Sequence, residues 1–249
     1  MNIINIILKS GSRNDPYSFR YFARPLAYVL TLLLSKHISA NSVTYIRAMI
    51  VLLTLYFFST GEIFLFKLAA SLVVVNSILD CLDGSIARKN NSATYWGKFL
   101  DGFVDGLLYP LIPLAGAISL LHQELFNLYL IYIFIFSAFI GLLEQSIMNK
   151  LSFYREWIKN KENIQETHLY FYSVPKLFFS KIYFDIHHFT SFVAIFLMQP
   201  IYYFLLISLT NSIISLIRLI NLLIAANKNI NLKKNSNFIS LKDINDKEH

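Results

Sequence analysis

The sequence predicts an all-α polytopic membrane protein in which an amphipathic juxtamembrane helix precedes six transmembrane helices. Hydrophobic residues make up 55% of the 249 residues and aromatic residues 16%, which is too apolar for an ordinary soluble domain of this length. Apolar runs of about 20 residues, long enough to cross a bilayer as helices, recur along the chain. We expect spans at about 43–60, 63–87, 96–120, 125–147, 182–198 and 201–225.

The regions on either side of this membrane domain (43–226) differ from it in composition. In the N-terminal region, 1–42, the apolar run at 3–8 is too short for a signal peptide. Residues 17–36 mix aromatic and basic side chains with a leucine-rich run, which predicts an amphipathic helix along the membrane surface. The C-terminal region, 227–249, is rich in Asn, Lys and Ser and is expected to be a flexible polar tail.

The distribution of basic residues predicts the orientation in the membrane. Of the 22 Lys and Arg residues, five precede the first span, three lie around the second-to-third connection, six in the fourth-to-fifth connection and five in the tail. The other connections hold almost none, so the positive-inside rule places both termini and the second-to-third connection in the cytoplasm. Lysines beside anionic lipid account for the net charge of +7, and we expect no nucleic-acid partner.

Asp80, Asp83, Asp101 and Asp105 predict a functional site, because a charge inside a span costs roughly 2.5–3.5 kcal/mol on insertion scales. Asp80 and Asp83 share one face of the second span, and Asp101 and Asp105 share one face of the third. The short polar turn at 89–94 joins these spans as an antiparallel hairpin. The two acidic faces can therefore meet near the cytoplasmic surface.

Four ionised carboxylates in one place repel each other unless cations compensate them. These are hard oxygen ligands with no histidine or cysteine at matching spacing, which favours Mg²⁺ or Mn²⁺ over zinc. Four carboxylates suit two metal ions, an arrangement used for displacement at phosphorus. Beside them, Gly84 and Gly97 allow a substrate close to the backbone. Arg88 places a positive charge where a diphosphate would lie, and Thr94 offers a hydroxyl.

Together these residues spell Asp-x2-Asp-Gly-x2-Ala-Arg-x8-Gly-x3-Asp-x3-Asp over 80–105, which closely resembles the signature of the CDP-alcohol phosphotransferase family. The resemblance extends to Asn41 and Thr44 at the start of the first span. Relatives commonly have a proline before this asparagine, whereas this chain has Ala40.

The resemblance implies that a CDP-linked alcohol gives its phosphoalcohol group to an acceptor hydroxyl, with release of CMP. It implies that the four aspartates bind two Mg²⁺ or Mn²⁺ ions, that Asp105 is also the general base, and that the enzyme is a homodimer. The residues expected to hold the nucleotide are Asn41, Thr44, Gly84, Arg88, Thr94 and Gly97.

Four further polar residues lie within or beside later spans and are candidates for binding the acceptor. They are Glu144, His187, His188 and Arg218. Glu144 or a histidine would orient a polar acceptor or assist proton transfer, and Arg218 would bind a phosphate. The alternatives are interhelical hydrogen bonds for Glu144, interfacial placement for the histidines and snorkelling for Arg218.

Two substrate schemes fit the family resemblance. In the favoured scheme, CDP-diacylglycerol is the donor and a water-soluble alcohol is the acceptor, as in phospholipid biosynthesis. In the alternative, CDP-choline or CDP-ethanolamine is the donor and a diacylglycerol-like lipid the acceptor. A third hypothesis, from another class, is a non-enzymatic cation transporter, which predicts acids spread along the bundle axis rather than clustered at one face.

Overall fold

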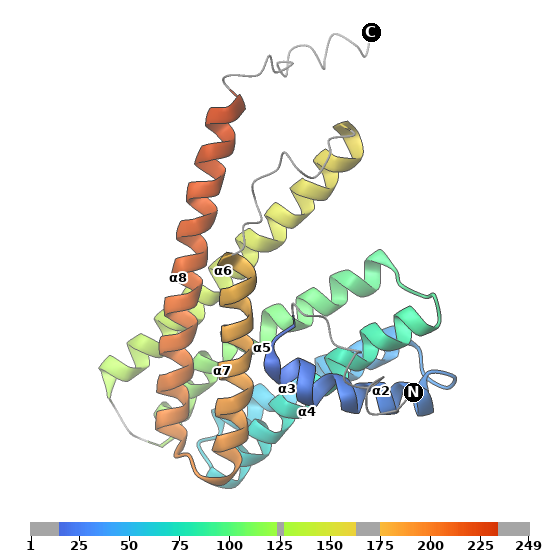
Figure 1. Cartoon of the computed structure of the whole chain (residues 1–249). Helices are drawn as coiled ribbons and strands as arrows, with labels where there is room; N and C mark the ends of the chain where they lie inside the picture. Colours follow the sequence, from blue (N-terminus) through green and yellow to red (C-terminus); the bar gives the residue numbers. More distant parts are fainter. Residues whose placement is uncertain (1–14, 124–126, 163–174, 234–249) are drawn as a thin grey trace.

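The computed structural model describes residues 15–123, 127–162 and 175–233, and every regular element within these ranges is a helix. The all-α prediction is therefore confirmed for the described part of the chain. Figure 1 shows α7 and α8 side by side, with α2 at the right of the view. In chain order the elements are the π-helical turn η1 (Phe19–Ala23), α2 (Arg24–Leu34), α3 (Ala40–Ser59), α4 (Ile63–Lys89), α5 (Tyr95–His122), α6 (Leu128–Glu162), α7 (Pro175–Phe196) and α8 (Pro200–Lys233).

Five of these helices contain stretches long and apolar enough to cross a membrane, and they correspond to five of the six predicted spans. The stretches are Ala40–Ser59, Ile63–Lys89, Tyr95–His122, Leu128–Met148 and Pro200–Asn221. α7 covers the predicted fifth span but is not among the stretches found in the described residues, and it carries the polar residues Lys181 and Asp185 and two histidines. It nevertheless packs against both α4 and α8.

Two helices continue beyond their predicted spans. α6 extends to Glu162, past the apolar stretch that ends at Met148. α8 extends to Lys233, so the first residues of the region expected to be a flexible tail are helical. The segment from 227 to 233 contains no Gly or Pro to end a helix. Residues 234–249 lie outside the described ranges.

The N-terminal helical segment packs along the bundle through η1 and α2. Its buried residues are spaced four apart and include Phe19, Ala23 and Ala27. The opposite side of the segment exposes large apolar side chains, including Leu26 and Leu33. This segment is the one expected to lie along the membrane.

Polar contacts hold both ends of this N-terminal segment. The Asp185 carboxylate of α7 accepts hydrogen bonds from the backbone N–H groups of Tyr17 (3.0 Å) and Ser18 (2.7 Å). At the other end, Asn90 donates a hydrogen bond of 2.8 Å to the Ser35 carbonyl. Asp185 therefore acts as a cap for a helix start that is distant in sequence.

Tight turns bring α3, α4 and α5 together. Gly61 joins α3 to α4 with a φ of +80°, a left-handed conformation that favours glycine. Asn91, in the turn between α4 and α5, has a φ of 50°, which asparagine tolerates better than most residues. Thr94 caps α5, because its hydroxyl accepts a 3.0 Å hydrogen bond from the Gly97 N–H. These turns place the acidic ends of α4 and α5 side by side.

Gly116 of α5 lies against the aromatic core and gives a stability prediction. A Cβ atom at Gly116 would lie 2.6 Å from the Phe204 ring, whereas a Cβ at Gly102 would meet nothing within 4 Å. We expect Gly116→Ala to destabilise the protein by about 1–3 kcal/mol through overpacking. Gly102→Ala, the matched control, should be neutral or stabilising by up to about 1 kcal/mol. Thermal unfolding in detergent measures both, and equal melting temperatures would contradict this packing.

Candidate active site

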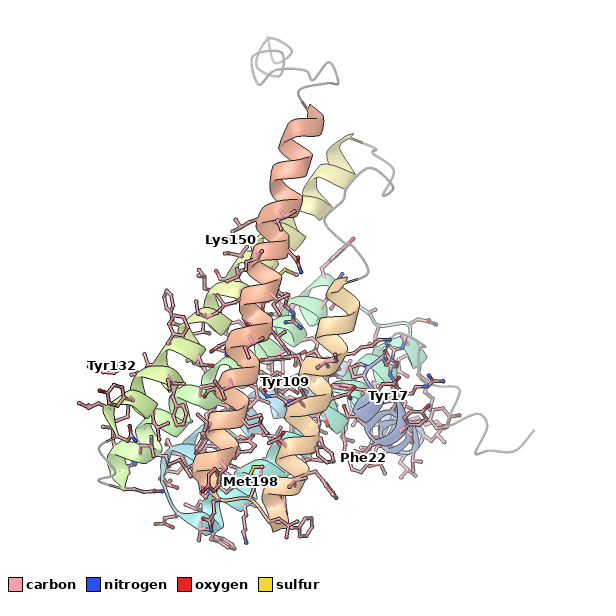
Figure 2. All side chains as sticks on the ribbon, turned by 60° about the vertical axis from the view of Figure 1, so that its left-hand side comes forward. Tyr17, Phe22, Tyr109, Tyr132, Lys150 and Met198 are labelled. Atoms are coloured by element: carbon pink, nitrogen blue, oxygen red, sulfur yellow. The ribbon has the colours of Figure 1, made fainter. Side chains whose placement is uncertain are left out.

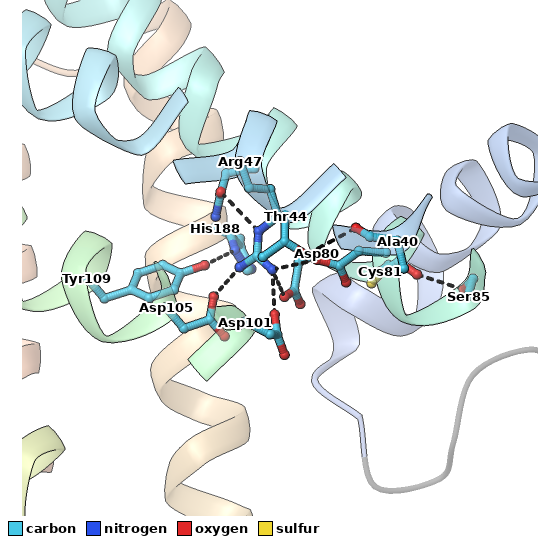
Figure 3. Close-up of polar contacts among 12 residues, drawn as sticks. Ala40, Thr44, Arg47, Asp80, Cys81, Ser85, Asp101, Asp105, Tyr109 and His188 are labelled. Carbon is cyan, nitrogen blue, oxygen red and sulfur yellow. Dashed lines mark hydrogen bonds and ion pairs between the residues drawn. The ribbon is translucent and has the colours of Figure 1, made fainter. Parts of the chain in front are cut away.

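The four aspartates of the motif converge on one guanidinium group, that of Arg47 on α3 (Figure 3). The Arg47 Nη1 atom lies 2.8 Å from Asp80, 3.1 Å from Asp83 and 2.5 Å from Asp101. Its Nη2 atom pairs with Asp105. The predicted meeting of the two acidic helix faces therefore occurs, and a third helix contributes to the cluster.

Arg47 is the main residue that the motif analysis missed. Its side chain is 0% exposed, whereas the Asp101 side chain is 42% exposed, so the arginine lies deeper in the bundle than this aspartate. A signal was present in the sequence, since Asn41, Thr44 and Arg47 are spaced three apart and share one face of the helix. An arginine within a span is also costly enough to require a partner.

The acidic cluster fits a divalent metal ion. Asp80, Asp101 and Asp105 each offer a carboxylate oxygen, and these oxygens lie within 4.8 Å of one another. Asp83 is outside this group of three, and it accepts a 2.9 Å hydrogen bond from the Thr44 hydroxyl. An all-oxygen donor set of this kind suits Mg²⁺ or Mn²⁺. The identity of the metal stays a prediction.

A pocket of about 240 Å³ opens beside the cluster between the cytoplasm-facing ends predicted for α3, α4 and α5. Two of the aspartates, Asp83 and Asp101, line it. All six residues expected to hold the nucleotide also line it, and Lys98 adds a second basic side chain. The six are Asn41, Thr44, Gly84, Arg88, Thr94 and Gly97.

The two glycines of this pocket allow neighbouring side chains to lie close to the backbone. A Cβ at Gly97 would lie 3.0 Å from the Asn41 side chain and 3.2 Å from the Thr94 hydroxyl. A Cβ at Gly84 would lie 3.3 Å from the Arg88 guanidinium. Arg88 is exposed and makes one 3.4 Å hydrogen bond with Ser85, which leaves most of its donors directed to solvent. These glycines therefore leave room for the side chains around the pocket.

Glu144 and Arg218 form an interhelical ion pair between α6 and α8. The Arg218 Nη1 atom lies 3.5 Å from a Glu144 oxygen, and the guanidinium stacks over the Tyr183 ring at 5.1 Å. Glu144 is buried, and Arg218 points to it within the bundle instead of reaching outward to the interface. This ion pair is an interhelical contact of the kind that the alternative for Glu144 describes.

The two histidines are buried within the bundle, not placed at its surface. His188 links the α5 helix to the N-terminal segment, because its ring nitrogens lie 3.0 Å from the Tyr109 hydroxyl and 3.0 Å from the Ser18 hydroxyl. His187 packs between the rings of Tyr109 and Tyr183, and neither of its ring nitrogens has a hydrogen-bond partner among the described residues.

Tyr109 lies between the acidic cluster and these histidines. It follows Asp105 by one helical turn on α5, and in Figures 2 and 3 it lies inside the bundle and points to His188. By contrast, Tyr132 projects from the outer side of α6 (Figure 2). Tyr109 thus connects the histidines to the region of the acidic cluster. The Glu144–Arg218 pair lies against Tyr183.

The fold and the site define a multi-span helical membrane protein with an acidic centre beside a basic, glycine-lined pocket. A family model for CDP-alcohol phosphatidyltransferases matches residues 37–198. The chain belongs to the CDP-alcohol phosphatidyltransferase family, whose members transfer substituted phosphate groups in phospholipid biosynthesis.

Two relatives, from Rickettsia typhi (strain Wilmington) and Rickettsia prowazekii (strain Madrid E), are each 40% identical to the chain over 68 residues. Each is a CDP-diacylglycerol--glycerol-3-phosphate 3-phosphatidyltransferase. The match covers 27% of this chain and 38% of each relative, so it spans well under half the length of these proteins.

Proposed function

We propose that the protein transfers a phosphatidyl group from CDP-diacylglycerol to the hydroxyl of a water-soluble acceptor, glycerol 3-phosphate or a similar alcohol, and releases CMP. The observation that carries this proposal is the convergence of four motif aspartates beside one pocket lined by all six expected nucleotide residues. The family supports the reaction class, and the names of the two relatives support the donor and the acceptor.

In this proposal, the nucleotide occupies the pocket with its diphosphate between Arg88 and the aspartates. Asp105 removes the proton from the acceptor hydroxyl, and the acceptor oxygen attacks the β-phosphorus. A new phosphorus–oxygen bond forms as the bond to the CMP oxygen breaks, with inversion at phosphorus. Two Mg²⁺ or Mn²⁺ ions held by Asp80, Asp83, Asp101 and Asp105 would neutralise charge on the diphosphate.

The acceptor is proposed to enter from the side of Tyr109. Arg218 supplies the positive charge that a phosphate on the acceptor requires, and its partner Glu144 fixes its orientation. His187 has buried ring nitrogens that an acceptor hydroxyl would satisfy. His188 holds Tyr109 in place between the two regions.

The membrane setting of this proposal has six spans, in which α7 is the fifth along the chain, and the N-terminal segment lies along the inner surface. The apolar outer side of that segment and the packing of α7 against α4 and α8 support this arrangement. We place both termini and the site on the cytoplasmic side, as the distribution of basic residues predicts. A homodimer is proposed from the family resemblance.

The proposed function is tested by CMP release from the purified protein in detergent with Mg²⁺ or Mn²⁺. CDP-diacylglycerol and CDP-choline are offered separately, each with glycerol 3-phosphate, inositol, serine and diacylglycerol as acceptors. We expect CMP only with CDP-diacylglycerol and a water-soluble acceptor. CMP from CDP-choline with diacylglycerol would favour the alternative scheme, and no CMP from any pair would contradict the proposed function.

Arg88 is expected to contribute to donor binding but not to the fold. Arg88→Ala should weaken CMP binding by about 10- to 100-fold, since a hydrogen bond to a charged group contributes roughly 1.5–3 kcal/mol. Calorimetric titration with CMP measures the change. Arg20→Ala, which removes an arginine stacked on Tyr21 outside the pocket, serves as the control and should bind CMP normally. Unchanged CMP affinity in Arg88→Ala would remove Arg88 from the diphosphate site.

A further inference from the structure

Arg47 is fully buried and takes no part in the proposed reaction. Burial of an arginine is costly, and burial of several carboxylates together is costly as well. In this protein each offsets the cost of the other, because the fully buried guanidinium contacts all four aspartates. The charge compensation that the sequence assigned to metal ions alone is thus partly supplied by the chain.

The contacts between Arg47 and the four aspartates follow one pattern. Each aspartate contributes one of its two oxygens: Oδ1 of Asp80, Oδ2 of Asp83, Oδ1 of Asp101 and Oδ1 of Asp105. The Thr44 hydroxyl bonds the same Oδ2 atom of Asp83. These contacts leave the second oxygen of each carboxylate for another cation.

Asn76 of α4 helps to hold the Arg47 side chain in place. The Arg47 Nε atom lies 3.4 Å from the amide oxygen of Asn76 on α4, so the side chain is held by a neighbouring helix as well as by the acids. The Arg47 side chain is fully buried, whereas the side chains of Asp80, Asp101 and Asp105 are partly exposed. A metal ion can therefore approach from the side opposite to Arg47.

We propose that Arg47 is a built-in cation that assembles the acidic site before any metal ion binds, holding one oxygen of each aspartate and leaving the other for the ions. Arg47 is a positioning residue in this role, because it acts on the acids and not on the substrate. The proposal rests on the proposed metal site. It goes beyond that site because one residue of α3 holds the four aspartates together when no metal ion is bound.

Two measurable consequences follow from the charge of Arg47. Without it, four carboxylates are uncompensated in the metal-free protein, so Arg47→Met should melt at a much lower temperature than the wild type, and saturating Mn²⁺ should restore most of the difference. The bound ion also no longer faces a neighbouring positive charge. Mn²⁺ should therefore bind Arg47→Met at least about tenfold more tightly than the wild type.

The experiment measures Mn²⁺ binding by electron paramagnetic resonance, and melting temperature with and without Mn²⁺, on the full-length protein in detergent. Arg47→Lys keeps the charge and should lie closer to the wild type than Arg47→Met in both quantities. Lys67→Met removes one positive charge from the exposed far end of α4 and should change neither. Asp101→Asn should lose most Mn²⁺ binding, which assigns the signal to this site.

The outcomes separate this inference from the proposed metal site. If Mn²⁺ affinity falls or stays equal in Arg47→Met, or if its metal-free melting temperature equals that of the wild type, the inference is wrong. Failure of Arg47→Met to fold even in saturating Mn²⁺ would also refute it, because an ion would then not replace the arginine charge. If the wild type binds no Mn²⁺, or Asp101→Asn binds it equally well, the metal site itself is refuted.

Discussion

Asp105→Asn is expected to lower kcat by about 10²- to 10⁴-fold, the usual contribution of a general base. Asparagine keeps the size of the side chain and removes its capacity to accept the acceptor proton. CMP binding should remain measurable, because Asp105 does not line the nucleotide pocket. The measurements are steady-state CMP release with CDP-diacylglycerol and glycerol 3-phosphate, and a CMP titration of the same preparation.

Two controls are needed to interpret this result. Glu62→Gln removes an exposed carboxylate at the opposite end of α4 and should leave kcat unchanged. The melting temperature of Asp105→Asn must also be recorded, because the change removes one of the ion pairs of Arg47. Full activity in a folded Asp105→Asn protein would remove the base assignment, whereas loss of CMP binding with activity would indicate a wider disruption.

Chelation of divalent ions is expected to abolish activity and leave the protein folded. The activity should disappear because the diphosphate and the aspartates would repel one another without the ions. The fold should persist because Arg47 still compensates the acids. Excess EDTA tests both, with CMP release for activity and thermal unfolding for the fold, followed by addition of Mg²⁺ or Mn²⁺ to restore turnover.

EDTA saturated with Mg²⁺ is the control for this prediction and should leave activity intact. Turnover that persists through extended treatment with excess EDTA would contradict the metal assignment. Unfolding of the wild type on chelation would contradict the role inferred for Arg47 and leave the metal assignment in place. The two readouts therefore test different parts of the site.

Local patterns in the sequence predicted the helical hairpin and its acidic faces. Hydropathy located the five stretches that the structure shows to be long and apolar enough to cross a membrane. Helical spacing placed Asp80 with Asp83 and Asp101 with Asp105, and the short turn brought the two pairs together. Both signals are local, since they depend on residues that are neighbours in the chain or on the same helix.

Hydropathy predicts a membrane span less clearly where polar residues of the helix take part in packing. α7 is a full helix against α4 and α8, yet its lysine, aspartate and histidine residues lower its hydropathy. The structure gives two of these residues structural partners: Asp185 caps the N-terminal segment, and His188 bonds Tyr109 and Ser18. The helix ends of α6 and α8 were also missed, since hydropathy marks where an apolar stretch stops and not where helical hydrogen bonding stops.

The sequence by itself determined the family signature, the helical class and six of the residues that line the pocket. Only the tertiary structure decided which charges meet: Arg47 with the four aspartates, and Arg218 with Glu144. The physical reason is that an isolated charge in a span is recognisable as costly from composition, but its partner lies on another helix. The packing of the helices determines the partner, and residue spacing along one helix does not predict that packing.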